Sequence, residues 1–166
     1  MVFSIFALLS VVLCWKGGGW RRWKEYYPTM LYFYIGDLAC DILMYNRPLW
    51  AFGQFSFNYP FLDLIITAFL YPSTTILFLT YFPEKRRRQP LYLLLWAGIY
   101  SSVELIGYLV GDFKYFNSWN IGYSVLFNLV MFPMLRLHYK HQLLVWPVST
   151  ALAFAMVLIF KVNLAR

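Results

Sequence analysis

The stretch that most constrains this chain is residues 27–45, YPTMLYFYIGDLACDILMY, an apolar run that contains two aspartates. Such a run forms about 27 Å of α-helix, which is close to the hydrocarbon thickness of a bilayer. Asp37 and Asp41 are four residues apart, so their carboxyl groups share one helix face. A charge in hydrocarbon costs about 2.5–3.5 kcal/mol even on a lenient insertion scale. We therefore expect this face to meet other helices, a cavity or water, and not lipid.

The composition is that of an integral membrane protein. Of the 166 residues, 61% are hydrophobic and only 13% are charged, whereas soluble domains are about half apolar and about one quarter charged. The length suits one compact bundle. We expect residues 1–166 to form a single transmembrane helical domain embedded in a lipid bilayer.

Six apolar runs follow one another along the sequence. They cover residues 2–15, 27–45, 61–81, 91–110, 119–135 and 143–160. The pattern predicts an all-α, polytopic transmembrane bundle of six spans, joined on one side by an aromatic, turn-rich connection and a short polar one. The first run makes only about 21 Å of helix, so the alternative is five spans preceded by an N-terminal interfacial helix.

The net charge of +7 is concentrated in three connections, residues 16–24, 82–90 and 136–142. These connections hold ten of the fourteen Lys and Arg residues, and the remaining four are elsewhere. The positive-inside rule places the three connections in the cytoplasm, and with six spans both chain ends lie outside. A nucleic-acid partner is not expected, because such proteins carry their basic residues on a solvated surface.

The acidic residues gather toward the side opposite the basic connections. Helical rise puts Asp37 about 14 Å, and Asp41 and Glu104 about 20 Å, above the basic side. Asp63 begins the third run from the other side, and Asp112 lies at the outer surface. No Lys or Arg occurs inside any of the six runs. We therefore expect an outward-facing intramembrane acidic site.

Three physical states are compatible with such a site. The carboxyl groups are protonated, they bind a hard cation such as calcium, magnesium or manganese, or they line a water-filled vestibule. The functional hypothesis is a site that binds or moves a cation, a proton or a cationic solute. Its ligands or proton carriers would be Asp37, Asp41, Asp63 and Glu104, with Asn128 as neutral support. The structural alternative is that protonated acids donate hydrogen bonds that hold the bundle together, at about 0.6 kcal/mol each.

Two other classes of function remain open. A non-catalytic assembly or scaffold subunit would bind a membrane protein or a second copy through Gly107 and Gly111, a small-residue pair that permits close helix packing. An intramembrane enzyme acting on a lipid or isoprenoid would use paired carboxyl groups as acid and base. The sequence has no GxSxG, HExxH, Walker A or CxxC signature, so it names no catalytic residue, metal or cofactor, and an enzyme is the less favoured class.

The histidines and cysteines predict no further site. His138 and His141 lie in a basic connection without carboxylates or thiols, so we expect interfacial or solvated side chains and not metal ligands. Cys14 and Cys40 belong to different apolar runs, and we expect two buried free thiols.

Three segments carry a resemblance to a known family. They are WKEYYPTMLYFYIGDL (23–38), FLYPSTTILFLTYFP (69–83) and YLLLWAGIYSSVELIGY (92–108). The order of WKxYYPT, a YPxT span and W-x3-Y-x3-E resembles a family of small, uncharacterised polytopic membrane proteins from spore-forming Firmicutes. The resemblance implies a multi-pass protein of the bacterial cytoplasmic membrane, and it brings no known activity or ligand.

Overall fold

The computed structural model describes residues 2–52 and 59–162, and within these it leaves out the side chains of residues 52, 59–63, 65 and 66. Its α-helices are α1 (Val2–Lys16), α2 (Trp23–Leu43), α3 (Tyr59–Thr80), α4 (Gln89–Leu109), α5 (Ile121–Lys140) and α6 (Gln142–Ile159). Short elements between them are the 3-10 turns η1 (Gly19–Arg22) and η2 (Arg86–Arg88) and the strands β1 (Trp50–Phe52) and β2 (Phe113–Tyr115). The prediction of an all-α protein is confirmed, with a two-stranded sheet as an addition.

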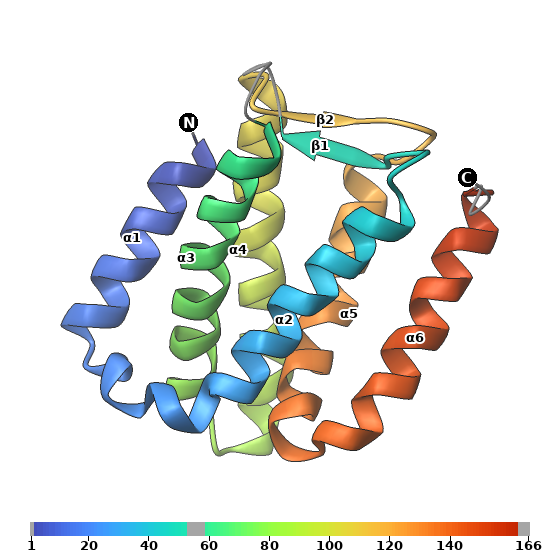
Figure 1. Ribbon diagram of the computed structural model, residues 1–166. Helices are drawn as coiled ribbons and strands as arrows, with labels where there is room; N and C mark the ends of the chain where they lie inside the picture. Colours follow the sequence, from blue (N-terminus) through green and yellow to red (C-terminus); the bar gives the residue numbers. More distant parts are fainter. Residues whose placement is uncertain (1, 53–58, 163–166) are drawn as a thin grey trace.

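The connections between the helices divide between the two ends of the bundle. The turns from α1 to α2, from α3 to α4 and from α5 to α6 lie at one end, and the strands lie at the other, with the start of α1 and the end of α6 (Figure 1). The first set corresponds to residues 16–24, 82–90 and 136–142. We call this the basic end, and the other the sheet end.

Several helices are long and apolar enough to cross a membrane. Among the described residues these are α5, α6 and the continuous segment of η2 and α4, Arg86–Leu109. Val2–Lys16 and Gly19–Leu43 are long and apolar enough only when they are taken together as one span. They are bent by 82° at the glycines between them. In α3, Thr67–Thr80 is a shorter apolar helix. The chain is therefore a helical membrane protein in which three to four of the described helices are long and apolar enough to cross a bilayer. The count of six spans stays a prediction.

The most buried helix is α3, which packs against α1 and α2. Residues 71–79 are all buried except the half-buried Pro72. Because proline lacks an N–H, it removes one backbone hydrogen bond from the helix. The neighbouring hydroxyls bond to the preceding turn, with Ser73 Oγ donating to the Phe69 carbonyl and Thr74 Oγ1 donating to the Leu70 carbonyl, both at 2.7 Å. The two hydroxyls therefore find hydrogen-bond acceptors inside their own helix, which allows these polar side chains to be buried in the core.

The two strands tie two long connections together at the sheet end. β1 pairs antiparallel with β2, with Trp50 opposite Tyr115, Ala51 opposite Lys114 and Phe52 opposite Phe113. The α2–α3 and α4–α5 connections therefore meet across this end of the bundle (Figure 1). The sequence predicted connections here but no strands, because three residues are too few to give a strand pattern.

Candidate functional site

Asp37 lies in the second half of α2 and is half-buried. The hydroxyl of Tyr71, from α3, donates a hydrogen bond to Asp37 Oδ1 at 2.8 Å. The Tyr71 ring is buried and stacks on Phe33 with ring centroids 4.2 Å apart, so packing fixes where the hydroxyl points. The carboxyl group is thus held at the α2–α3 contact by a neutral donor.

A second tyrosine approaches Asp37 from α4. The Tyr100 hydroxyl is hydrogen-bonded to Thr74 Oγ1 at 2.6 Å, and it lies near enough to Asp37 to interact with it electrostatically. The Tyr100 ring packs edge-on against Phe132, with centroids 5.1 Å apart. Three helices therefore contribute to the surroundings of Asp37: its own α2, together with α3 and α4.

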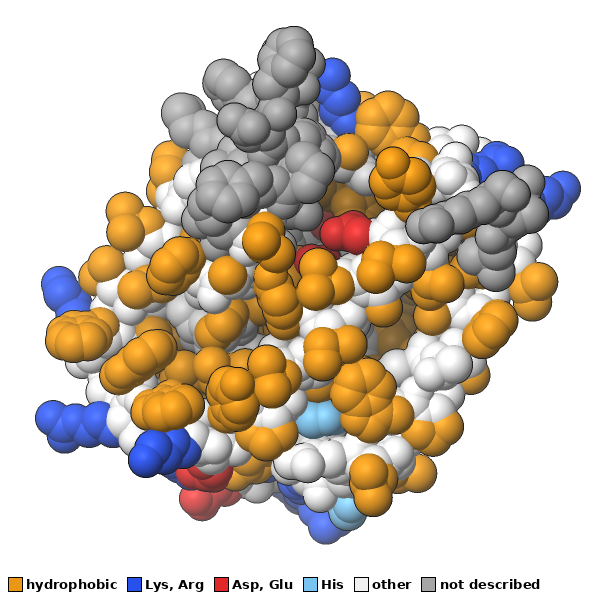
Figure 2. Space-filling model, viewed as in Figure 1, with side chains coloured by type: hydrophobic (Ala, Val, Ile, Leu, Met, Phe, Trp, Pro, Cys, Tyr) orange, Lys and Arg blue, Asp and Glu red, His pale blue; other side chains and the backbone are white. Residues whose placement is uncertain are grey.

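Asp41 lies one turn beyond Asp37, toward the sheet end, and its side chain is exposed. Because α2 is continuous from Trp23 to Leu43, the prediction that the two carboxyl groups share one face of a helix is confirmed. Figure 2 shows acidic side chains in the upper part of a face that is otherwise mostly hydrophobic. The pair therefore connects the surface, at Asp41, with the inter-helix contact, at Asp37.

Glu104 belongs to a separate part of the molecule. It lies half-buried on α4 and accepts a hydrogen bond from the Tyr115 hydroxyl at 3.0 Å. Ser124 of α5 lies close to both side chains, and it accepts a hydrogen bond from Trp119 Nε1 at 2.8 Å. The surroundings of Glu104 therefore depend on β2, an element that the sequence did not predict.

Asn128 supports the α4–α5 contact and not the aspartate pair. Its Nδ2 donates to Ser101 Oγ at 3.1 Å, and both residues are buried. Ser101 lies one turn before Glu104 on α4, and Asn128 lies one turn after Ser124 on α5. These four residues form a polar seam between the two helices.

The predicted acidic site is thus built in two parts, around Asp37 and around Glu104. Asp63 lies near the start of α3, but its side chain is outside the described residues. Asp112 lies after α4, where its Oδ2 accepts a hydrogen bond from the Val2 amide at 2.6 Å. Among the described residues, no three or more His, Cys, Asp and Glu side chains are grouped so that they could hold a metal ion.

The hydrogen bond from Tyr115 to Glu104 can be tested directly. Replacing Tyr115 by Phe removes the donor and leaves a half-buried carboxyl group less satisfied, so we expect the free energy of unfolding to fall by about 1–3 kcal/mol. Tyr123→Phe is the matched control, because Tyr123 lies at the same end and is exposed. It should change stability by less than about 0.5 kcal/mol. Denaturant unfolding of the purified variants measures both, and equal stability of the two would show that the bond contributes nothing.

The two glycines that predicted close helix packing have different surroundings. A Cβ on Gly107 would lie 2.8 Å from Cε2 of Phe3, so α1 of the same chain covers this position. Gly111 lies beyond the end of α4 with φ 82°, and nothing stands within 4 Å of its Cβ position. The Asp112 amide donates to the Gly107 carbonyl at 2.8 Å. This is the bond of a Schellman motif, in which a glycine of left-handed conformation ends a right-handed helix. Gly111 therefore ends the helix, and Gly107 admits Phe3.

The prediction of an interfacial or solvated side chain is wrong for His138. His138 is only 2% exposed, because α5 continues to Lys140 and turns this residue into the bundle. Its Nδ1 is hydrogen-bonded to Thr29 Oγ1 at 3.1 Å, and its ring stacks on Tyr32 with centroids 4.2 Å apart. The Tyr32 hydroxyl in turn bonds to Ser149 Oγ at 2.6 Å, so α2, α5 and α6 meet here. The expectation of an exposed side chain holds for His141.

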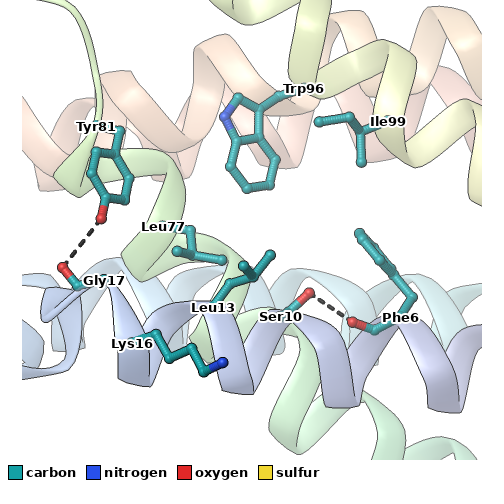
Figure 3. A pocket seen from close by; sticks show the side chains of 9 residues that line it. All are labelled: Phe6, Ser10, Leu13, Lys16, Gly17, Leu77, Tyr81, Trp96 and Ile99. Carbon is teal, nitrogen blue, oxygen red and sulfur yellow. Dashed lines mark hydrogen bonds between the residues drawn. The ribbon is translucent and has the colours of Figure 1, made fainter.

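Two grooves are lined by described residues. One, of about 580 Å³, lies between α1, α3 and α4 on the side of the basic end (Figure 3). The other, of about 330 Å³, lies along α4 and α5. Neither is lined by an Asp or Glu residue.

No family model, curated protein or solved structure matches this chain. The resemblance to small polytopic membrane proteins of spore-forming Firmicutes therefore stays a prediction, and the functional argument depends on the residues themselves.

Proposed function

We propose that this chain is a small multi-pass protein of the bacterial cytoplasmic membrane that takes up a proton, a cation or a cationic solute at Asp37 and Asp41. The observation that carries the proposal is the aspartate pair, one carboxyl group at the surface and the next, one turn along α2, hydrogen-bonded inside the bundle. Residues 25–46 contain no Lys or Arg. An ionisable side chain within a transmembrane segment is costly to place there, and it supports a functional-site hypothesis by default.

The arrangement suggests an order of events. A cation or proton would reach Asp41 first, because this side chain is exposed. It would then pass to Asp37, where the Tyr71 hydroxyl occupies one carboxylate oxygen.

A proton or a cationic solute fits these residues better than calcium does. Calcium requires about six to eight oxygen ligands. Two carboxyl groups and two tyrosine hydroxyls have six oxygens in total, so even the minimum would require all of them, including those that are already hydrogen-bonded. The polar seam that contains Glu104 lies on α4 and α5. There the carboxyl group would have a separate, structural role.

The orientation belongs to the same proposal. The three basic connections would face the cytoplasm, with six spans and both chain ends outside. The gathering of residues 16–24, 82–90 and 136–142 at one end of the bundle supports this orientation (Figure 1). The aspartate pair would then face outward.

The other two classes of function gain less from the structure. Gly107, which the scaffold hypothesis needs on a free surface, lies against Phe3 of the same chain. An enzyme acting on a lipid would need a groove that reaches the acids, and the two grooves described above have no acidic lining.

The proposal is tested by thermal unfolding of the detergent-purified chain across pH and a panel of sodium, potassium, magnesium, calcium, manganese and tetramethylammonium chlorides. A ligand present at 100 times its dissociation constant stabilises the folded state by about 2.7 kcal/mol. For a chain of this length we expect the melting temperature to rise by about 5–10 °C. Asp41→Asn should insert and fold but lose this rise, since it removes the surface carboxylate.

Glu25→Gln is the matched control. Glu25 is an exposed acid of the same helix at the basic end, where it is paired with Arg22 at 2.8 Å, so the variant should respond to the ligand as the natural chain does. The proposal is wrong if neither pH nor any of these cations changes the melting temperature, or if D41N responds as fully as E25Q. The acids would then be structural hydrogen-bonding groups.

A further inference from the structure

The groove between α1 and α4 exists because these helices touch near the sheet end and separate toward the basic end (Figure 1). Phe3 of α1 lies against Gly107 of α4, and Phe6 packs edge-on against Tyr100 with ring centroids 5.6 Å apart. Beyond Phe6 the space between the helices is not filled by the chain. The wide end of this wedge lies toward the basic connections.

Hydrocarbon and aromatic side chains form most of the groove. Figure 3 shows side chains from α1 on one side, from α4 on the other and from α3 between them. The lining residues are Phe6, Ser10, Leu13 and Lys16 of α1, Gly17 just after it, Leu77 of α3, Tyr81 just after that helix, and Trp96 and Ile99 of α4. The residues from α1 recur at three- and four-residue intervals, so they share one helix face.

Both hydroxyl groups of the lining donate hydrogen bonds within the protein. Ser10 Oγ donates to the Phe6 carbonyl at 2.8 Å, and the Tyr81 hydroxyl donates to the Gly17 carbonyl at 3.1 Å (Figure 3). Neither hydroxyl needs a polar ligand as a hydrogen-bond acceptor. The groove therefore suits an apolar occupant along its length.

Its mouth, in contrast, is basic. Lys16 is the one charged residue of the lining and is exposed, and Arg21, Arg22 and Lys24 follow within eight positions. Trp15 and Trp20 flank it with exposed indole rings, which is typical of residues at the headgroup level. An occupant with an apolar tail and an anionic head would match both halves of the groove.

The length of the groove matches one leaflet of a bilayer. From Phe6 to Lys16, α1 rises about 15 Å, which is half of a hydrocarbon core of about 30 Å. An acyl chain that lies along this lining would therefore extend from the headgroup level to the middle of the bilayer. We propose that this groove binds one acyl chain of an anionic phospholipid from the leaflet at the basic end, with the lipid phosphate at Lys16. The site shares no residue with the aspartate pair and stands without the proposed function.

The test uses the full chain in detergent, titrated with dioleoyl phosphatidylglycerol or dioleoyl phosphatidylcholine and analysed by native mass spectrometry. We expect one tightly bound phosphatidylglycerol per chain and weaker binding of phosphatidylcholine. Lys16→Gln should weaken phosphatidylglycerol binding about five-fold, to the level of phosphatidylcholine, because one basic residue is lost. Ile99→Trp should fill the groove and remove both lipids.

Two matched controls keep the result specific. Lys24→Gln removes a nearby charge that does not line the groove. Leu94→Trp adds the same bulk on another face of α4, where Leu94 is exposed and lines the second groove. Both should bind phosphatidylglycerol as the natural chain does.

The inference is overturned if the natural chain binds the two lipids equally, if K16Q binds phosphatidylglycerol as tightly as K24Q, or if a folded I99W variant retains the lipid. It is also overturned if the chain is a dimer that I99W dissociates, because a second copy would then occupy the groove. K16Q alters only an exposed side chain, so it decides the question even where I99W fails to fold.

Discussion

Phe78→Ala is expected to lower the free energy of unfolding by about 3–5 kcal/mol. Phe78 is fully buried in the middle of the most buried stretch of α3. Its ring contacts four other aromatic rings, with centroid distances of 5.2–5.8 Å, namely those of Phe82, Tyr92, Trp96 and Phe132. Large, stiff rings cannot close around the space that a deleted phenyl group leaves. The cavity term should therefore add fully to the loss of contacts.

Phe69→Ala is the control for this substitution. Phe69 lies on the same helix and is 59% exposed, so removing its ring creates no cavity and should cost less than about 1 kcal/mol. Reversible unfolding in mixed micelles, followed by near-ultraviolet circular dichroism, compares the two variants. Equal losses for F78A and F69A would contradict the conclusion that α3 is the core of the bundle.

The helices could be predicted closely from the sequence because each apolar run is bounded by residues that end helices or carry charge. The predicted run 91–110 corresponds to the helix Gln89–Leu109, and the predicted run 143–160 corresponds to the helix Gln142–Ile159. The largest difference is at α5, which runs to Lys140 where residues 136–142 were predicted as a connection. Leu135, the last residue of the predicted run, and His138, three positions later, are both buried, which is the spacing of residues on one helix face.

The surroundings of the acids could be predicted only in part. Helical rise gives the height of a residue along the bundle, and it brought Asp37, Asp41 and Glu104 to similar levels. It does not give the rotation of each helix or which helices are neighbours. Those decide that Asp37 meets Tyr71, 34 positions along the chain, and that Glu104 meets Tyr115. The second contact also requires the pairing of two three-residue strands from distant connections.

Gly107→Leu is expected to destabilise the chain by about 3 kcal/mol, through overpacking and not through loss of a partner. A Cβ at this position stands 2.8 Å from Cε2 of Phe3 and 3.5 Å from Cβ of Phe113. Neither group can retreat easily, because the Phe3 and Phe113 rings also pack on each other with centroids 5.5 Å apart. α1 would have to move away from α4. Gly98→Leu is the control on the same helix, since nothing lies within 4 Å of its Cβ position.

Phe3→Ala shows whether G107L destabilises the chain through overpacking or through loss of a partner. If the cost of G107L comes from contact with Phe3, the double variant F3A/G107L should recover part of it, with a coupling energy of about 1–3 kcal/mol in a double-mutant cycle. Chemical unfolding of the four proteins measures that coupling. A scaffold that used Gly107 to bind another protein would give a different result: G107L as stable as the natural chain, no coupling to Phe3, and loss of a stoichiometric partner on purification. That outcome would mean that α1 does not cover α4 here, and that the small residue serves an interface between proteins.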